Sequence, residues 1–94
     1  MKSNRRDGPH ASIARALRQV GCDVLDLSRV GDGCADLLVY RKSKNQMTFL
    51  EVKSARGVQS LEQLAFAARY PVHVVRSVDD ALRAMGFTEI NMRR

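Results

Sequence analysis

Apolar and polar residues near the N-terminus alternate with the period of a helix. Within residues 11–20 the apolar positions repeat every three or four residues, and Gly21 follows directly. This spacing predicts one amphipathic helix that ends before the glycine. The side expected to be buried carries Ile13, Ala16, Leu17 and Val20.

Three short apolar segments follow, and polar turn residues separate them. Their length and alternation are typical of β-strands, which we expect at 22–27, 35–41 and 47–53. Only residues 42–46 join the last two segments. A loop of that length predicts an antiparallel hairpin.

Helix and strand alternate in the C-terminal half. Ser60 opens a predicted helix that ends at Pro71, residues 72–75 form a strand, and a last helix is expected between Ser77 and Gly86. The order αβββαβα predicts an α/β domain of three layers, a mixed β-sheet flanked by helices. A helix between the third and fourth strands allows those two strands to be parallel. The middle helix is expected to bury Leu61, Leu64, Ala65 and Ala68.

Length and composition limit the class of protein. The chain has 94 residues, of which 45% are hydrophobic and 28% charged, as expected for one folded domain. We expect this domain at 11–87, between a flexible basic N-terminal segment (1–10) and a basic tail (88–94). No apolar run reaches the length of a membrane span, and there is no secretory signal pattern. Two cysteines are too few for a disulfide scaffold, so we expect a protein of the reducing cytoplasm. No organic cofactor is expected.

The charge favours a polyanionic partner. Sixteen basic residues, twelve of them Arg, stand against ten acidic residues, which gives a net charge of +6. Lys and Arg that neutralise phosphates release counterions, although a solvated basic surface would have the same composition. With 5% aromatic residues we expect recognition of shape or branching rather than of base sequence. The candidate phosphate contacts are Arg5, Arg6, Arg29, Arg41, Lys42 and Arg56.

Two acidic residues occur in apolar strands. Asp36 opens the second strand, and Glu51 lies inside the third strand, where Lys53 shares its face. In a hairpin these three side chains converge near one end. Two carboxylates and a strand carbonyl can bind Mg²⁺, and a neighbouring lysine can orient the attacking water, which is the chemistry of phosphodiester hydrolysis. The alternative is a plain ion pair between Glu51 and Lys53, with Asp36 ending a turn.

A wider set of motifs resembles a known nuclease family. Asp36 followed by Glu51-Val52-Lys53 resembles the PD-(D/E)XK motif of restriction-endonuclease-like nucleases. Together with segments 27–39, 49–53 and 74–82, and with Ser60 and Gln63, it resembles the virus-type replication-repair nuclease domain, VRR-NUC. The likeness covers nearly the whole chain and is closest to the stand-alone members from phages and prophages. It implies a cytoplasmic protein of a bacterial or phage-infected host cell.

The resemblance implies a role for each matched residue. Asp36, Glu51 and the backbone carbonyl of Val52 would bind Mg²⁺ or Mn²⁺, Lys53 would be the catalytic lysine, and Gln63 would lie near the active site. The implied activity is DNA cleavage by a homodimer similar to Holliday junction resolvases, on branched or structured DNA. From the residues alone, Gln63 could equally belong to a capping box that begins at Ser60.

The chain departs from the family at two places. Ala35 stands where the family usually has proline, and the first helix lacks the acidic residue that often supports the metal. Two other functions therefore stay open: a catalytically degenerate DNA-binding module on the same fold, and a protein-interaction subunit with a basic face.

Overall fold

Three helices and four strands follow one another in the predicted order. The computed structural model describes residues 9–87, so the predicted N-terminal segment up to residue 8 and the tail 88–94 lie outside the described residues. The hairpin loop contains one additional short 3₁₀ helix. The elements are α1 (His10–Gln19), β1 (Asp23–Asp26), β2 (Leu37–Arg41), η1 (Lys42–Lys44), β3 (Gln46–Val52), α2 (Leu61–Arg69), β4 (Val72–Val75) and α3 (Val78–Ala84).

The strands form one mixed sheet in the order β1-β2-β3-β4. β2 is antiparallel to both β1 and β3, whereas β3 and β4 are parallel. This confirms the predicted hairpin and the predicted parallel pair. The α/β class with a mixed sheet is confirmed as well, because α2 provides the crossover between the parallel strands.

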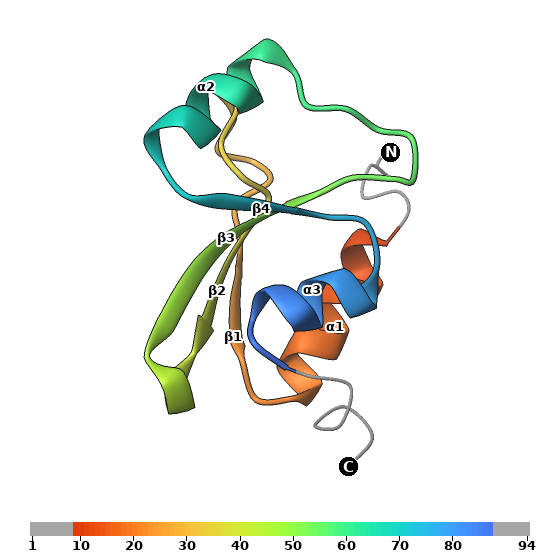
Figure 1. Ribbon diagram of the computed structural model, residues 1–94, viewed down its shortest axis with the longest axis vertical. Helices are drawn as coiled ribbons and strands as arrows, with labels where there is room; N and C mark the ends of the chain where they lie inside the picture. Colours follow the sequence, from red (N-terminus) through yellow and green to blue (C-terminus); the bar gives the residue numbers. More distant parts are fainter. Residues whose placement is uncertain (1–8, 88–94) are drawn as a thin grey trace.

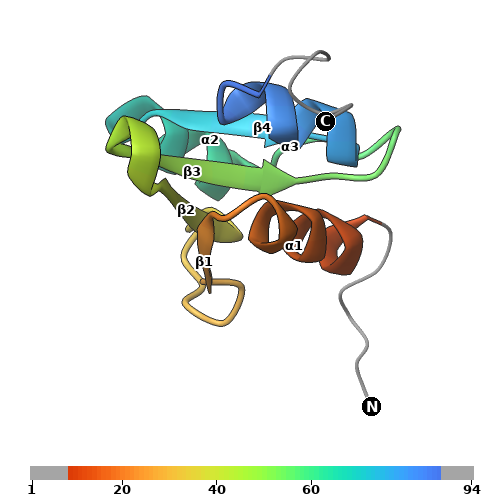
Figure 2. The same ribbon diagram turned by 90° about the horizontal axis from the view of Figure 1, so that it is seen from below.

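Helices α1 and α3 pack against each other and cover one face of the sheet (Figure 1). Seen from below, the two helices flank the arrowhead of β3 (Figure 2). Gly21, with φ of +96°, ends α1 as predicted, and the N–H of Cys22 donates to the carbonyl of Leu17 at 3.0 Å. The core between these layers consists of Ile13, Leu17, Cys22, Leu37, Val39, Leu50, Val75, Ala81, Leu82 and Met85.

Helix α1 begins one residue earlier than the sequence predicts. His10, which the sequence places in the N-terminal segment, is the first helical residue and is buried. Of the predicted apolar side, Ile13 and Leu17 are buried, whereas Val20 is 41% exposed. The helix therefore faces the sheet about one position away from the predicted side, through His10 and Ala14.

The predicted buried side of α2 is wrong. Leu61 is 84% exposed and Leu64 49% exposed, and none of the nine α2 residues is buried. The helix turns Gln63 and Phe66 toward the sheet instead, where Phe66 contacts Phe49 edge-on with ring centroids 5.2 Å apart. Polar and aromatic contacts therefore orient α2 more strongly than its aliphatic stripe does.

Within the part of the chain that the structure describes, every helix is too short and too polar to cross a membrane. The longest, α1, has ten residues, whereas a membrane-spanning helix needs about 20.

Two alanine substitutions test the orientation of α2. Leu50 is fully buried between the sheet and the helices, so Leu50→Ala should lower the free energy of unfolding by about 2–5 kcal/mol. Leu61→Ala removes the same atoms from an exposed position and should change it by less than about 0.5 kcal/mol. Urea titrations of both variants measure the difference, and a large loss for Leu61→Ala would contradict this orientation.

Candidate active site

The β2–β3 hairpin brings the two predicted carboxylates together. Leu37 pairs with Leu50, so the antiparallel register, continued by one residue, sets Asp36 opposite Glu51. Asp36 lies just before β2, and its backbone N–H donates to the Leu50 carbonyl at 3.1 Å. Its side chain accepts the N–H of Val52 at 2.8 Å. The hairpin therefore fixes Asp36 through both its backbone and its carboxylate.

Glu51 is a buried carboxylate on the sheet face that α1 and α3 leave uncovered. Its side chain is only 2% exposed, because α2 lies over this end of the face. The amide nitrogen of Gln63 donates to Glu51 Oε2 at 2.7 Å. The ammonium of Lys53 lies 3.7 Å from the same oxygen. Lys53, directly after β3, shares this face as the strand alternation predicts.

The side chain of Gln63 connects α2 to both members of the Glu51–Lys53 pair. Its amide oxygen accepts from the Lys53 ammonium at 2.9 Å and from the N–H of Ser60 at 2.8 Å. In return the Ser60 hydroxyl accepts the N–H of Gln63 at 3.1 Å, which completes a capping box. The two interpretations of Gln63 from sequence, helix cap and site contact, are therefore both satisfied by one conformation.

The arrangement perturbs two acidic groups. Burial and, after it, the neighbouring Asp36 carboxylate raise the pKa of Glu51 from 4.5 to about 7, against the opposing effect of Lys53. Burial also raises the pKa of the Cys34 thiol, and the charges of Asp36 and Glu51 add to that effect. Cys34 is thus a neighbour of the site that sequence analysis did not identify, and its thiol stays protonated at neutral pH.

The turn before β2 supports the site by packing against α2. At Gly33, with φ of +77°, an added Cβ would lie 2.3 Å from the carbonyl oxygen of Glu62 and 2.9 Å from the backbone nitrogen of Gln63. Only glycine permits this approach, because any side chain would push the first turn of α2 away. Sequence analysis identified the turn but not this contact, which joins segments far apart in the chain.

Arg76 holds the loop that follows Lys53. Its guanidinium donates to the carbonyls of Ser54 at 2.6 Å and Gly57 at 2.8 Å. Gly57 packs closely on Lys53, since a Cβ there would lie 3.4 Å from the lysine stem. Arg76 therefore helps to fix the loop that packs on Lys53, a role that no local sequence pattern indicates.

The four predicted phosphate contacts within residues 9–87 do not all lie near the site. Arg56 is exposed in the loop after Lys53, and Arg29 is exposed in the turn after β1. Arg41 is bound in the fold at the far end of the hairpin, where its guanidinium donates to the Met85 carbonyl at 2.9 Å and stacks on Phe87. Lys42 is exposed at the same end. The predicted contacts Arg5 and Arg6 lie outside the described residues.

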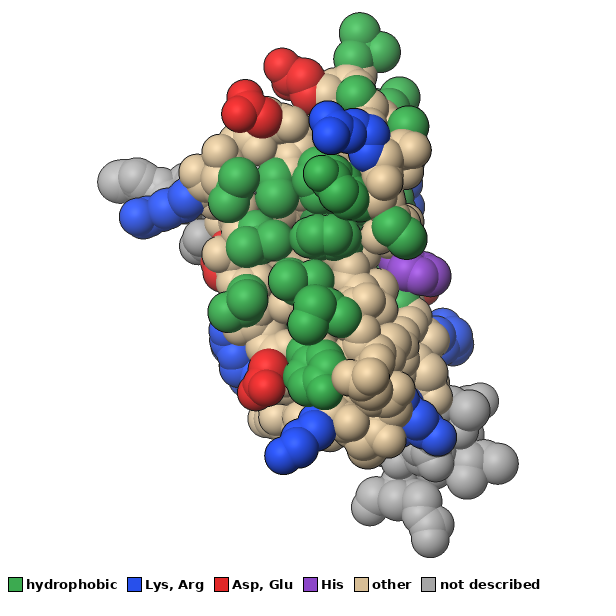
Figure 3. All heavy atoms as spheres, turned by 90° about the vertical axis from the view of Figure 1, so that its left-hand side faces the viewer, with side chains coloured by type: hydrophobic (Ala, Val, Ile, Leu, Met, Phe, Trp, Pro, Cys, Tyr) green, Lys and Arg blue, Asp and Glu red, His purple; other side chains and the backbone are tan. Residues whose placement is uncertain are grey.

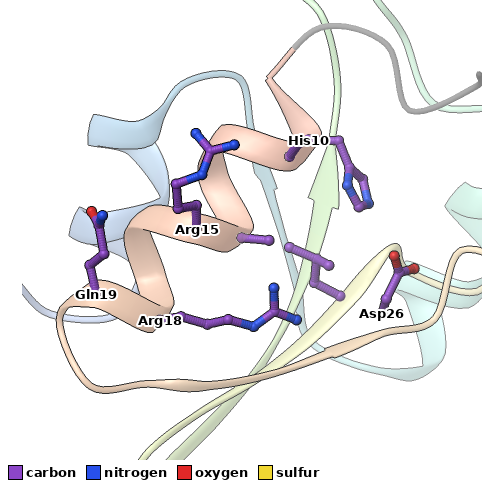
Figure 4. Close-up of a pocket in the computed structure, with 8 residues that line it drawn as sticks. His10, Arg15, Arg18, Gln19 and Asp26 are labelled. Atoms are coloured by element: carbon purple, nitrogen blue, oxygen red, sulfur yellow. The ribbon is translucent and has the colours of Figure 1, made fainter.

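A separate hollow lies beside α1, and its polar side chains are shown in Figure 4. The Arg18 guanidinium donates to the Val24 carbonyl at 3.2 Å, and Asp26 accepts two hydrogen bonds from Ser28. His10 Nε2 is buried and has no hydrogen-bond partner among residues 9–87. The hollow reaches Leu37 but contains none of the predicted catalytic side chains.

The donor set suits a hard divalent cation that keeps water ligands. The N–H and C=O of a strand residue point to the same side, so the Val52 carbonyl faces Asp36 as its N–H does. Asp36, Glu51 and that carbonyl are all oxygen donors, as Mg²⁺ and Mn²⁺ prefer. Within residues 9–87 there is no group of three or more His, Cys, Asp or Glu side chains that could hold a metal.

Comparisons with known proteins do not add a family. No family model matches the chain, and neither a curated protein nor a solved structure matches it. The resemblance to VRR-NUC nucleases therefore stays a prediction from motifs.

The raised pKa of Glu51 predicts a pH-dependent stability. Between pH 4.5 and 7 the folded chain holds this proton and the unfolded chain releases it, so stability falls as the pH rises through that window. The contribution of Glu51 amounts to about 3 kcal/mol in total. Glu51→Gln removes it, so the variant should gain stability relative to the native chain between pH 5 and pH 8.

Urea titrations at each pH, with chelator present, measure this difference. Glu62→Gln is the matched control, because Glu62 is exposed on the same helix that covers Glu51. Parallel pH profiles for the native chain and Glu51→Gln would contradict a raised pKa.

Proposed function

We propose that this chain is a Mg²⁺- or Mn²⁺-dependent DNA endonuclease of the restriction-endonuclease-like class, similar to stand-alone VRR-NUC domains. The proposal is carried by one observation: Asp36, Glu51 and Lys53 meet at one end of the β2–β3 hairpin. The α/β fold with its mixed sheet agrees with this class. Structured DNA, such as a four-way junction, is the proposed substrate, and a homodimer is the proposed active form.

The residues at the hairpin end suit phosphodiester hydrolysis. A divalent cation, when bound, supplies polarisation of a phosphoryl oxygen and a water of lowered pKa. Asp36, Glu51 and the Val52 carbonyl would hold it. The Lys53 ammonium has three donors, so after bonding Gln63 it keeps capacity for the attacking water or a phosphate oxygen. Its positive charge would stabilise the charge that develops in the transition state.

Gln63 acts in this proposal as a positioning residue. Its oxygen serves two N–H donors, Lys53 and Ser60, and its nitrogen serves Glu51, so the orientation of the amide is determined. Because the capping box anchors Gln63 to α2, the lysine and the glutamate are held relative to each other by the helix terminus rather than by solvent-exposed side chains.

Cleavage assays with labelled DNA test the proposal. The panel contains a four-way junction, a flap, a duplex and a single strand, each with Mg²⁺, Mn²⁺ or chelator. Cleavage should require the metal, and Glu51→Gln and Lys53→Ala should each reduce it at least ~10²-fold, the scale found when a transition-state contact is removed. Glu62→Gln and Lys44→Ala are matched controls, because both side chains are exposed outside the site.

Native rates in Glu51→Gln and Lys53→Ala would refute the proposed catalytic site. Native rates in the two controls are expected, because their substitutions leave the hairpin end intact.

A second candidate is a DNA-binding module without catalysis. It is favoured by α1, whose first turn contains no acidic residue, and by the small number of carboxylates at the hairpin end. Calorimetric titration with Mn²⁺ separates the two functions. Binding that Glu51→Gln abolishes supports the nuclease, whereas no binding together with tight, salt-dependent DNA affinity supports the module.

A further inference from the structure

One face of the sheet is apolar and largely uncovered. We call it the open sheet face. It lies opposite α1 and α3, and α2 covers only the end near Phe49 and Glu51. Viewed from this side, hydrophobic side chains gather on the surface of the molecule (Figure 3). The strand register makes its side chains neighbours, because Leu25 pairs with Leu38 and Tyr40 pairs with Met47. The face consists of Leu25, Leu38, Tyr40, Met47, Phe49, Val72 and Val74.

Its apolar side chains are exposed in the middle of a sheet, not only at loops. Met47 on β3 is 62% exposed and Leu25 on β1 is 58% exposed, and both point to the same side as the half-buried Leu38. Single exposed apolar residues are ordinary, but a contiguous apolar patch on a folded domain marks an interaction site.

The open sheet face combines a protruding side chain with hollows. Two hollows of about 650 and 320 Å³ open onto it, and Leu38 and Met47 line both; the larger one extends around the β1 edge to Arg18 and Cys22. The exposed Met47 side chain therefore stands between two depressions. A two-fold interface needs protrusion and depression on the same patch, because each copy presents the same residues to the other.

The charges indicate a protein partner for this face and not a nucleic acid. The seven apolar and aromatic side chains that define it are uncharged, so they offer no cation to a phosphate; Glu51 and Lys53 lie on the same side of the sheet, at the end that α2 covers. Opposite charges occur at its two edges: Asp23 begins β1, and Arg69 ends α2 next to β4. A two-fold axis along the strands would set the β1 edge of each copy, with Asp23, against the β4 edge of the other, on whose side α2 ends at Arg69.

We infer that the open sheet face binds a second copy of this chain in a two-fold symmetric dimer. The dimer itself belongs to the proposed function, and the structure points to the surface that forms it. With the axis along the strands, both predicted catalytic sites lie at the same end of the dimer. The inference depends only on the face, so its test is independent of nuclease activity.

The mass in solution, measured by light scattering after size-exclusion chromatography, tests the inference. The native chain should have about twice the mass of one 10.5 kDa chain at micromolar concentration. Met47→Glu and Leu25→Glu each place a charge on the open sheet face and should raise the dissociation constant at least tenfold. Val58→Glu is the matched control, since Val58 is 80% exposed in the loop before α2 and should leave the dimer intact. Circular dichroism confirms that each variant is folded.

Salt distinguishes this apolar contact from an electrostatic one. Two copies of charge +6 repel each other, so raising the salt concentration should strengthen the dimer. A monomeric native chain overturns the inference, as does a dimer that survives both glutamate substitutions, which would indicate pairing through another surface. DNA cleavage by a stable monomer would overturn it and leave the nuclease proposal standing. A dimer that both glutamate substitutions weaken, but that cleaves no DNA, would support this inference and contradict the nuclease proposal.

Discussion

The burial of the Glu51 carboxylate is the constraint on which the site depends. A charged group that loses contact with water must be compensated by hydrogen bonds and opposite charge. Gln63 and Lys53 provide that compensation, and Asp36 works against it. The balance leaves a carboxyl group that retains its proton up to neutral pH. Such a group is stabilised as an anion by additional positive charge, so the metal ion of the proposed function would be favoured electrostatically at this end of the hairpin.

The order of elements and the hairpin follow from local patterns in the sequence. Short apolar segments, glycine turns and two serine caps predict the three α-helices and four strands of residues 9–87, and loop length predicts the antiparallel pairing. The meeting of Asp36, Glu51 and Lys53 then follows from strand alternation and register alone. These features depend on residues that are close in the chain, and for that reason they can be predicted from the sequence.

The orientation of α2 could not be predicted in this way. Its aliphatic positions form a regular stripe, yet the helix docks through Gln63, Phe66 and Tyr70. A glutamine at the first position of that docking side conceals the pattern, because a polar residue is expected to face water. The contacts of Gly33 and Arg76 could not be predicted from the sequence either. Both residues contact segments that are distant in the chain and that only the tertiary fold places next to them.

The absence of buried residues in α2 has a consequence for the motions of the site. Local opening free energies are lowest for elements with few buried apolar contacts, and amide hydrogens in such elements exchange with solvent without global unfolding. Helix α2 is held by a capping box, an aromatic cluster and the amide of Gln63, whereas β3 lies between two strands. The helix therefore opens before the sheet does. Each opening exposes Glu51 to water. Helix α2, which covers the carboxylate, and strand β3, which carries it, therefore belong to different cooperative units of the same small domain.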